Sequence, residues 1–144
     1  MLKNSLGGGS FIRPMFVDFP TIEIYRKSIS QFMMGTNMMA APVITQGETR
    51  KEVYFPNDLF YNFDSGALMN PKGEGSVYAA ADLSTLPLFL RAGSIVQVQK
   101  VPNNITNIIE MRKQPFQLKV GLDKNLWSYG RIMIDDGYCK YHYI

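Results

Sequence analysis

Short apolar runs separated by turn residues constrain the fold of this chain more than any other feature. From Glu48 onward the runs occupy residues 52–55, 59–61, 77–78, 86–98, 116–122 and 131–134. Apolar and polar residues alternate within 95–99 and 117–122, as they do in strands that place one face on a second sheet and the other in solvent. The pattern predicts a mainly β fold of the sandwich type.

The first part of the chain has a different pattern of apolar residues. Three consecutive glycines predict a flexible leader over residues 1–10. Residues 11–19 are an apolar run that predicts one buried strand, and Pro14 confines this strand to an edge or an irregular position because it cannot donate a ladder hydrogen bond. Residues 38–44 predict a second buried strand that ends in a turn.

Between these two runs the spacing of the apolar residues changes. Within 21–39 they recur at intervals of three and four, at Ile22, Tyr25, Ile29, Phe32 and Met33. This spacing places side chains on one face of a helix. We therefore expect a helix that ends near Gly35.

Charge and hydropathy exclude several classes of function. The 15 lysines and arginines outnumber the 12 acidic residues only slightly and form no basic run, so nucleic acid is not an expected partner. The longest strongly apolar stretch, 86–98, is shorter than the ~20 residues of a membrane-spanning helix, so no membrane span is expected. The segment before the glycines lacks the pattern of a secretory signal, and the compartment stays open.

The residues that most often bind metals are scarce. Cys139 has no second cysteine, which excludes an internal disulfide and a metal site built on paired thiolates. His142 has no cysteine or carboxylate at metal-ligand spacing and is expected to be an exposed residue of the tail. The sequence therefore predicts no metal and no cofactor.

Three stretches carry a resemblance to a known family. Residues 11–20 read Phe-Ile-Arg-Pro-Met-Phe-Val-Asp-Phe-Pro, residues 31–35 and 41–43 read Gln-Phe-Met-Met-Gly and Ala-Pro-Val, and residues 86–96 read Leu-Pro-Leu-Phe-Leu-Arg-Ala-Gly-Ser-Ile-Val. They resemble the segments Arg-Pro-Leu-Phe-x-Glu-Phe-Pro, Gln-Phe-Met-x-Gly with Ala-Pro-Val, and Ile-Pro-x-Phe-x-Arg-Gly-Gly-Ser-Ile-Ile of glycoside hydrolase family 31, the α-glucosidase type. Weaker matches at 53–56 and 134–137 extend the resemblance over nearly the whole chain.

The resemblance implies a division of the chain into three units after the leader. Residues 11–45 would be the end of a catalytic (β/α)8 barrel, a strand plus a helix. Residues 46–102 would form a proximal β-sandwich, and residues 103–144 the first strands of a distal one. The chain departs from the family at 58–62, which read Asp-Leu-Phe-Tyr-Asn in place of Gly-x-Trp-Tyr-Asp, and at 138–139, which read Tyr-Cys in place of Glu-Ser.

Glycoside hydrolysis with retention requires two carboxyl groups ~5–5.5 Å apart. The resemblance places both in motifs upstream of the matched region, Trp-x-Asp-Met-Asn-Glu and Trp-Thr-Gly-Asp, and neither string occurs in this sequence. No catalytic residue is therefore predicted. The adjacent pair Asp135 and Asp136 is expected to form a turn before Gly137. Asp18 is expected to pair with an arginine such as Arg13 or Arg91, because buried carboxylates are generally paired.

Two kinds of residue are candidates for binding or modification. Aromatic side chains are dense around 54–63, and Phe60 and Tyr61 are candidates for stacking on a sugar, although a packed sheet interface explains the same residues. Asn104 begins an Asn-Ile-Thr triplet, which is an acceptor pattern for N-glycosylation that also arises by chance.

The leading functional hypothesis is a fragment of an α-glucosidase-like enzyme that is inactive alone and closes the barrel. An α-glucoside or oligosaccharide would then be the substrate of the full enzyme. The alternatives are a free-standing carbohydrate-binding module and a structural β-sandwich module. Because a lone strand and helix would leave apolar faces of residues 11–44 uncovered, self-association is also expected.

Overall fold

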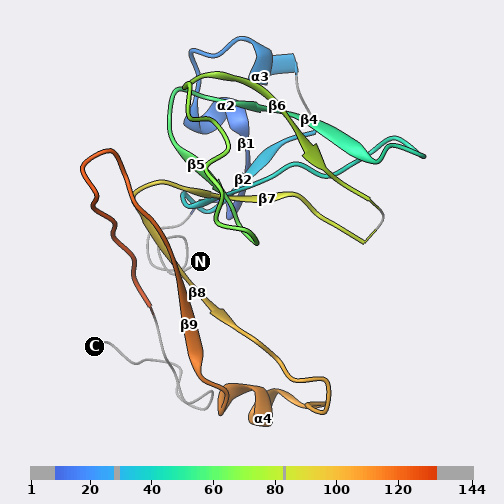
Figure 1. Cartoon of the computed structure of the whole chain (residues 1–144), viewed down its shortest axis with the longest axis vertical. Coiled ribbons are helices and arrows are strands. Elements are labelled where there is room, and N and C mark those ends of the chain that lie inside the picture. The colour runs from blue at the N-terminus through green and yellow to red at the C-terminus, as the bar shows by residue number, and fades with distance from the viewer. Residues whose placement is uncertain (1–8, 28–29, 83, 133–144) are drawn as a thin grey trace.

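The computed structural model describes residues 9–27, 30–82 and 84–132, and it is mainly β (Figure 1). Its elements are β1 (Ile12–Pro14), α2 (Met15–Asp18), α3 (Ile24–Lys27), β2 (Phe32–Met34), β3 (Met38–Ala40), β4 (Arg50–Phe55), β5 (Phe60–Asn62), β6 (Gly75–Ala80), β7 (Leu88–Arg91), β8 (Ser94–Gln99), α4 (Ile108–Arg112) and β9 (Phe116–Gly121).

The strands form one five-stranded sheet and two two-stranded sheets. The five-stranded sheet has the order β1-β2-β3-β7-β5, and all its neighbours are antiparallel. β4 pairs with β6, and β8 pairs with β9. The β4–β6 sheet lies with the five-stranded sheet and the helices α2 and α3 in the upper body, whereas the β8–β9 sheet extends away from it (Figure 1).

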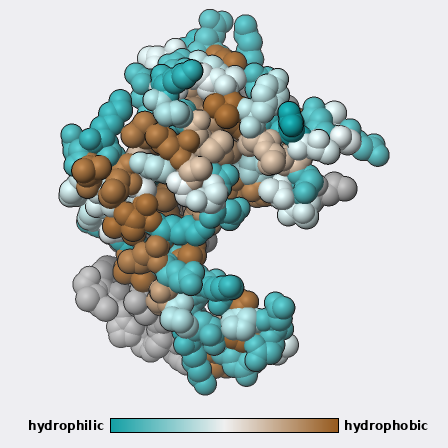
Figure 2. Space-filling model, viewed as in Figure 1, coloured by the Kyte–Doolittle hydropathy of each residue, from teal (hydrophilic) through white to brown (hydrophobic). Residues whose placement is uncertain are grey.

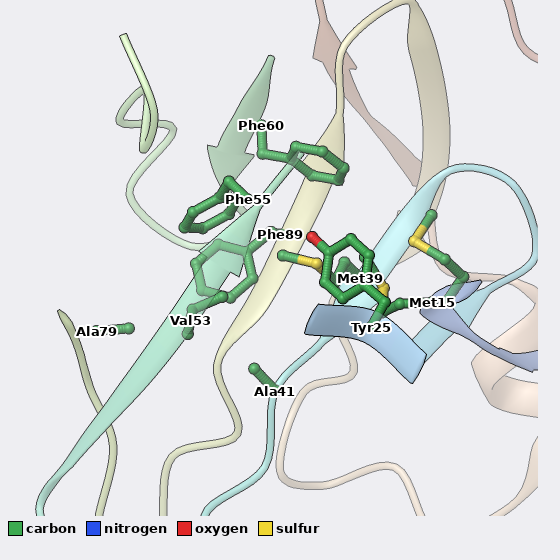
Figure 3. Packing of buried hydrophobic residues seen from close by; sticks show 10 residues of the cluster. Met15, Tyr25, Met39, Ala41, Val53, Phe55, Phe60, Ala79 and Phe89 are labelled. Atoms are coloured by element: carbon green, nitrogen blue, oxygen red, sulfur yellow. The ribbon is translucent and has the colours of Figure 1, made fainter. Parts of the chain in front are cut away.

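The core lies between the five-stranded sheet and the β4–β6 sheet. Met33, Met39 and Phe89 occupy one row across β2, β3 and β7, and all three are fully buried. Phe55 of β4 meets Phe89 edge to face, with ring centroids 5.0 Å apart, and Val53 packs beside it (Figure 3). The period-2 pattern of β4 therefore delivers its apolar face to the core.

The helix expected over residues 21–39 is correct only around Tyr25. Tyr25 lies in α3 and is buried, but Phe32 and Met33 belong to β2, and Ile29 lies outside the described residues. A turn at Gly35, with φ of +62°, folds β2 back onto β3, and Met33 pairs with Met39. The pairing of β2 with both β1 and β3 overrode a local spacing that also fits a helix.

The strand expected over residues 11–19 is shorter than predicted. β1 covers Ile12–Pro14 only, and the helical turn α2 follows from Met15. Pro14 has φ of −57°, which suits the residue before a helical turn, and it stands at the end of an edge strand as expected. The early end of β1 lets Met15 turn into the core.

Of the remaining strand predictions, those at 38–44, 52–55, 59–61, 77–78 and 116–122 are confirmed, whereas the one at 86–98 is subdivided and the one at 131–134 is wrong at its described residues. The run 86–98 is two strands, β7 and β8, separated by a turn at Gly93 with φ of +73°. Arg131 and Ile132 lie in no strand, and 133–134 lie outside the described residues. The helix α4 was not predicted, although Asn107 caps it by accepting a hydrogen bond from the Glu110 amide at 2.9 Å.

The pairings cross both boundaries that the resemblance implied. β3, from the segment 11–45, pairs with β7, so this segment shares one sheet with the predicted proximal sandwich. β8 pairs with β9 across residue 102. Among the helices of the described ranges, none is long and apolar enough to cross a membrane.

Candidate functional site

An ion pair fixes the beginning of the described fold. The Nε and Nη2 atoms of Arg13 donate to the two carboxylate oxygens of Asp18 at 3.1 and 2.8 Å, and Nη2 also donates to the Gly35 carbonyl at 2.8 Å. The side chains are 17% and 15% exposed, so the pair is largely shielded from solvent. The predicted pairing of Asp18 with Arg13 is confirmed, and it ties β1 and α2 to the turn between β2 and β3.

Arg91 makes a second ion pair, with a partner that was not predicted. Its Nε donates to Asp58 Oδ2 at 2.6 Å, so the expected pairing of Arg91 with Asp18 is wrong. Asp58 is in reach because buried Asn70 donates to the Asp58 carbonyl at 2.5 Å and orders this loop. The Arg91 guanidinium lies 5.1 Å from the centre of the Phe19 ring. Arg91 therefore links the loop before β5 to the segment after α2.

A groove of about 410 Å³ lies between α3 and the β4–β6 sheet. Its lining includes Ile24, Gln31, Tyr78 and four charged residues, Glu48, Arg50, Lys51 and Glu52. The two acidic and two basic side chains balance, so the groove has no strong charge of one sign. Such a lining suits a polar, neutral ligand better than a phosphate or another anion.

Hydrogen bonds to the Tyr54 backbone join three residues that line this groove. Buried Gln31 donates to the Tyr54 carbonyl at 3.0 Å and accepts from the Tyr54 amide at 3.0 Å. The Tyr25 hydroxyl donates to the same carbonyl at 2.8 Å, and burial raises the pKa of Tyr25 above its ordinary value. The hydrogen bond from the Tyr54 hydroxyl to Glu74, at 2.5 Å, raises the pKa of Tyr54. Both tyrosines are therefore neutral at ordinary pH.

The two candidates for sugar stacking lie in different environments. Phe60 is fully buried against Phe55, with ring centroids 5.6 Å apart, so the expectation that it stacks on a sugar is corrected here. The sequence could not show which face of β5 points inward. Tyr61 is half-buried and its hydroxyl donates to the Leu122 carbonyl at 2.8 Å, which ties the loop after β9 to β5. Stacking by Tyr61 stays a prediction.

The other predicted site residues stay apart from these features. Asn104 is exposed in a turn before α4, and its glycosylation stays a prediction. Asn62, which replaces a family aspartate, caps the next turn by accepting from the Asp64 and Ser65 amides at 3.0 and 2.8 Å. The pair 135–136 and residues 139 and 142 lie outside the described residues.

The chemistry available in the described ranges is limited. No three histidine, cysteine or carboxylate side chains gather there as a metal site. Asp82 accepts hydrogen bonds from the Ser84 hydroxyl and amide, at 2.7 and 2.9 Å, and the former chiefly lowers the pKa of Asp82. An acid held in its charged form is not suited to donate a proton to a leaving group.

One exposed feature of the structure was not predicted from the sequence. Trp127 and Tyr129 follow β9 and hold their rings parallel on the surface. Apolar side chains are exposed along this side of the molecule, from the upper body towards the β8–β9 sheet (Figure 2). The spacing of two residues between the aromatic positions was the signal that could have indicated a shared face.

Comparisons with known proteins agree with the fold. The model of the glycosyl hydrolase family 31 C-terminal domain matches residues 8–96. A "Probable alpha/beta-glucosidase" of Arthroderma benhamiae is 31% identical over 135 residues, which cover 94% of this chain and 15% of that protein. A "Probable alpha/beta-glucosidase agdC" of Aspergillus clavatus is 28% identical over 130 residues, which cover 90% of this chain and 14% of that protein.

Solved structures give the same result. The Tris-bound glucosidase II alpha subunit matches with a TM-score of 0.80 and 25% identity, over 92% of this chain and 14% of that one. The dextranase FjDex31A of Flavobacterium johnsoniae, in complex with glucose, matches with a TM-score of 0.71 and 25% identity, over 85% of this chain and 14% of that one. The chain spans about 15% of the length of the curated relatives it matches. It belongs to glycosyl hydrolase family 31, in the region of that family's C-terminal domain.

Proposed function

We propose that this chain acts as the non-catalytic β part of a family 31 glucosidase, and that the enzyme as a whole hydrolyses α-glucosides. The pairing of β3 with β7 carries the proposal, because it builds the segment 11–45 into the same sheet as the strands that follow. In this proposal residues 11–45 complete a catalytic barrel, and the sheet holds them in place.

The two ion pairs support a bracing role. Arg13 with Asp18, and Arg91 with Asp58 and Phe19, connect the first segment to the loops of the later strands. Partly shielded charge pairs of this kind fix one geometry more strongly than exposed pairs do. The carboxylates for the reaction would come from another part of the enzyme, since this sequence contains neither family motif.

The arrangement of the later units is also part of the proposal. Residues 46–102 would belong to the proximal sandwich, and residues 103–144 would begin the distal one. The turn at Gly93 separates the five-stranded sheet from the β8–β9 sheet, which supports a change of unit before β8, ahead of the boundary at residue 102.

A chimeric enzyme tests the proposal. The 144-residue chain would replace the matched C-terminal residues of the Arthroderma benhamiae glucosidase. We expect the chimera to hydrolyse an aryl α-glucoside and the isolated chain not to do so. Hydrolysis by the isolated chain that is abolished by Asp18→Asn would overturn the proposal.

Matched variants of the chimera test the bracing role. Arg13→Ala removes the shielded pair with Asp18 and should destabilise the chimera by about 3 kcal/mol, as measured by thermal unfolding. Lys27→Ala removes an exposed pair with Glu23, whose side chains are 81% and 80% exposed, and should change little. Equal effects of the two substitutions would contradict a bracing role for Arg13.

A further inference from the structure

The loop after β9 presents two parallel aromatic rings to solvent. The ring planes of Trp127 and Tyr129 differ by 3°, and the centroids are 6.1 Å apart. Stacked atoms in full contact lie ~3.5–4.0 Å apart, so rings at this separation overlap only in part. The residues are 59% and 52% exposed. Each ring therefore keeps much of its surface open to a ligand.

The backbone on both sides of the rings is fixed by hydrogen bonds. The Asp123 carboxylate accepts from the Trp127 amide at 2.9 Å, and the Asp123 amide donates to the Trp127 carbonyl at 2.9 Å. Tyr129 pairs with the start of β8, because its amide donates to the Gly93 carbonyl at 3.0 Å and its carbonyl accepts from the Ile95 amide at 3.1 Å. Because these hydrogen bonds already order the backbone in the folded protein, little further conformational entropy would be lost when a ligand binds.

A cationic group stands at the rim of this surface. The Nε atom of Arg131 donates to the Tyr129 hydroxyl at 2.6 Å, and its guanidinium carbon lies 6.0 Å from the centre of the Tyr129 ring. A guanidinium is a planar set of donors without an acceptor. The rings and the rim thus combine an apolar surface with hydrogen-bond donors.

We propose that Trp127 and Tyr129 form a binding surface for a gluco-oligosaccharide, with Arg131 donating to sugar hydroxyls. A pyranose ring has a face of C–H groups and a rim of hydroxyls, which matches an aromatic surface with a polar edge. The choice of a glucan as ligand rests on the proposed function. The surface lies apart from the groove beside β4 and would hold sugar without cleaving it.

The position of the single tryptophan allows a direct test. Trp127 is the one tryptophan of the sequence, so its fluorescence in the 144-residue chain reports on this surface alone. Maltotriose and isomaltotriose are expected to change the emission saturably at millimolar sugar. Tyr129→Ala should weaken the affinity about two- to tenfold. Tyr129→Phe keeps the ring and should retain most of the affinity, which separates stacking from a general loss of structure.

A second tyrosine provides the control. Tyr78 on β6 is also exposed and lines the groove, and Tyr78→Ala should leave the sugar response unchanged. No change of emission with either sugar would overturn the proposal. A response lost in Tyr78→Ala but kept in Tyr129→Ala would place binding in the groove. Emission that changes with protein concentration and not with sugar would indicate contact between copies of the chain. Either result would reject Trp127 and Tyr129 as the binding surface.

The outcomes are independent of the chimera assay. An active chimera together with no fluorescence response rejects this inference alone. A sugar response together with an inactive chimera rejects the proposed function and leaves the binding surface in place.

Discussion

Tyr25 joins the first helices to the β4–β6 sheet at a single buried position. Its ring meets Phe19 and Tyr54, with centroids 6.0 and 5.6 Å away, and its hydroxyl donates to the Tyr54 carbonyl. Burial raises the pKa of Tyr25, so the folded protein keeps this proton where the unfolded chain loses it. Ionisation of Tyr25 therefore opposes folding.

The raised pKa of Tyr25 predicts that the protein becomes less stable at alkaline pH. The unfolded tyrosine ionises near pH ~10, so the contribution of Tyr25 to the free energy of unfolding should be constant below that value and fall as the pH rises above it. Tyr25→Phe should cost about 0.5–1.5 kcal/mol at neutral pH, for the lost hydrogen bond, and should flatten the decline. Urea unfolding between neutral and alkaline pH measures both effects. The same slope in Tyr25→Phe and the parent chain would contradict the assignment, and exposed Tyr78→Phe is the control.

At the scale of elements, the pairing after β9 depends on one glycine. A Cβ on Gly130 would lie 2.7 Å from both the Cβ and the carbonyl oxygen of Ile95, too close for any side chain. The segment 127–130 can approach β8 only because this position has no side chain. This approach holds Tyr129 against Gly93 and Ile95.

Gly130→Ala should therefore separate the segment from β8. We expect a local loss of about 1–3 kcal/mol, as in overpacked cores. Hydrogen exchange of the Ile95 amide, which donates to the Tyr129 carbonyl, is the direct measurement and should become faster. Ser128→Ala adds no atom near β8 and should leave this exchange unchanged. Full protection of Ile95 in Gly130→Ala would show that the backbone accommodates the methyl group.

At the scale of the whole molecule, the exposed apolar side chains are numerous. Leu118 and Val120 lie two residues apart on β9, therefore on one face, and are 63% and 50% exposed. Ile12 and Val17 in the first segment are also exposed. Such surfaces in one chain favour association.

We predict that the isolated chain self-associates in a concentration-dependent way. Light scattering coupled to gel filtration measures this, and the double variant Leu118→Lys and Val120→Lys should lower the mean mass because the β9 face becomes charged. The control variant Lys100→Gln, at an exposed position after β8, should leave the mean mass unchanged. A monodisperse monomer of the parent chain would contradict the prediction.

How much of this structure was predictable depends on how local each signal is. The alternation in 95–99 is local, and β8 formed where it was expected. Phe32 and Met33 also fit a helix, and only their pairing with β1 and β3 decides that they form a strand. Phe60 was a candidate for sugar stacking because the sequence does not show which face of β5 is buried. Packing in the core places Phe60 on the buried face.

The order of strands in the five-stranded sheet affects how the chain can be made. Met38 of β3 pairs with Leu90 of β7, and β5 joins the sheet only through β7. During synthesis from the N-terminus, the free edge of β3 must wait for β7 to leave the ribosome. Until then the edge of β3 that pairs with β7 lacks its partner, so we expect misassembly to compete with folding most strongly at this stage.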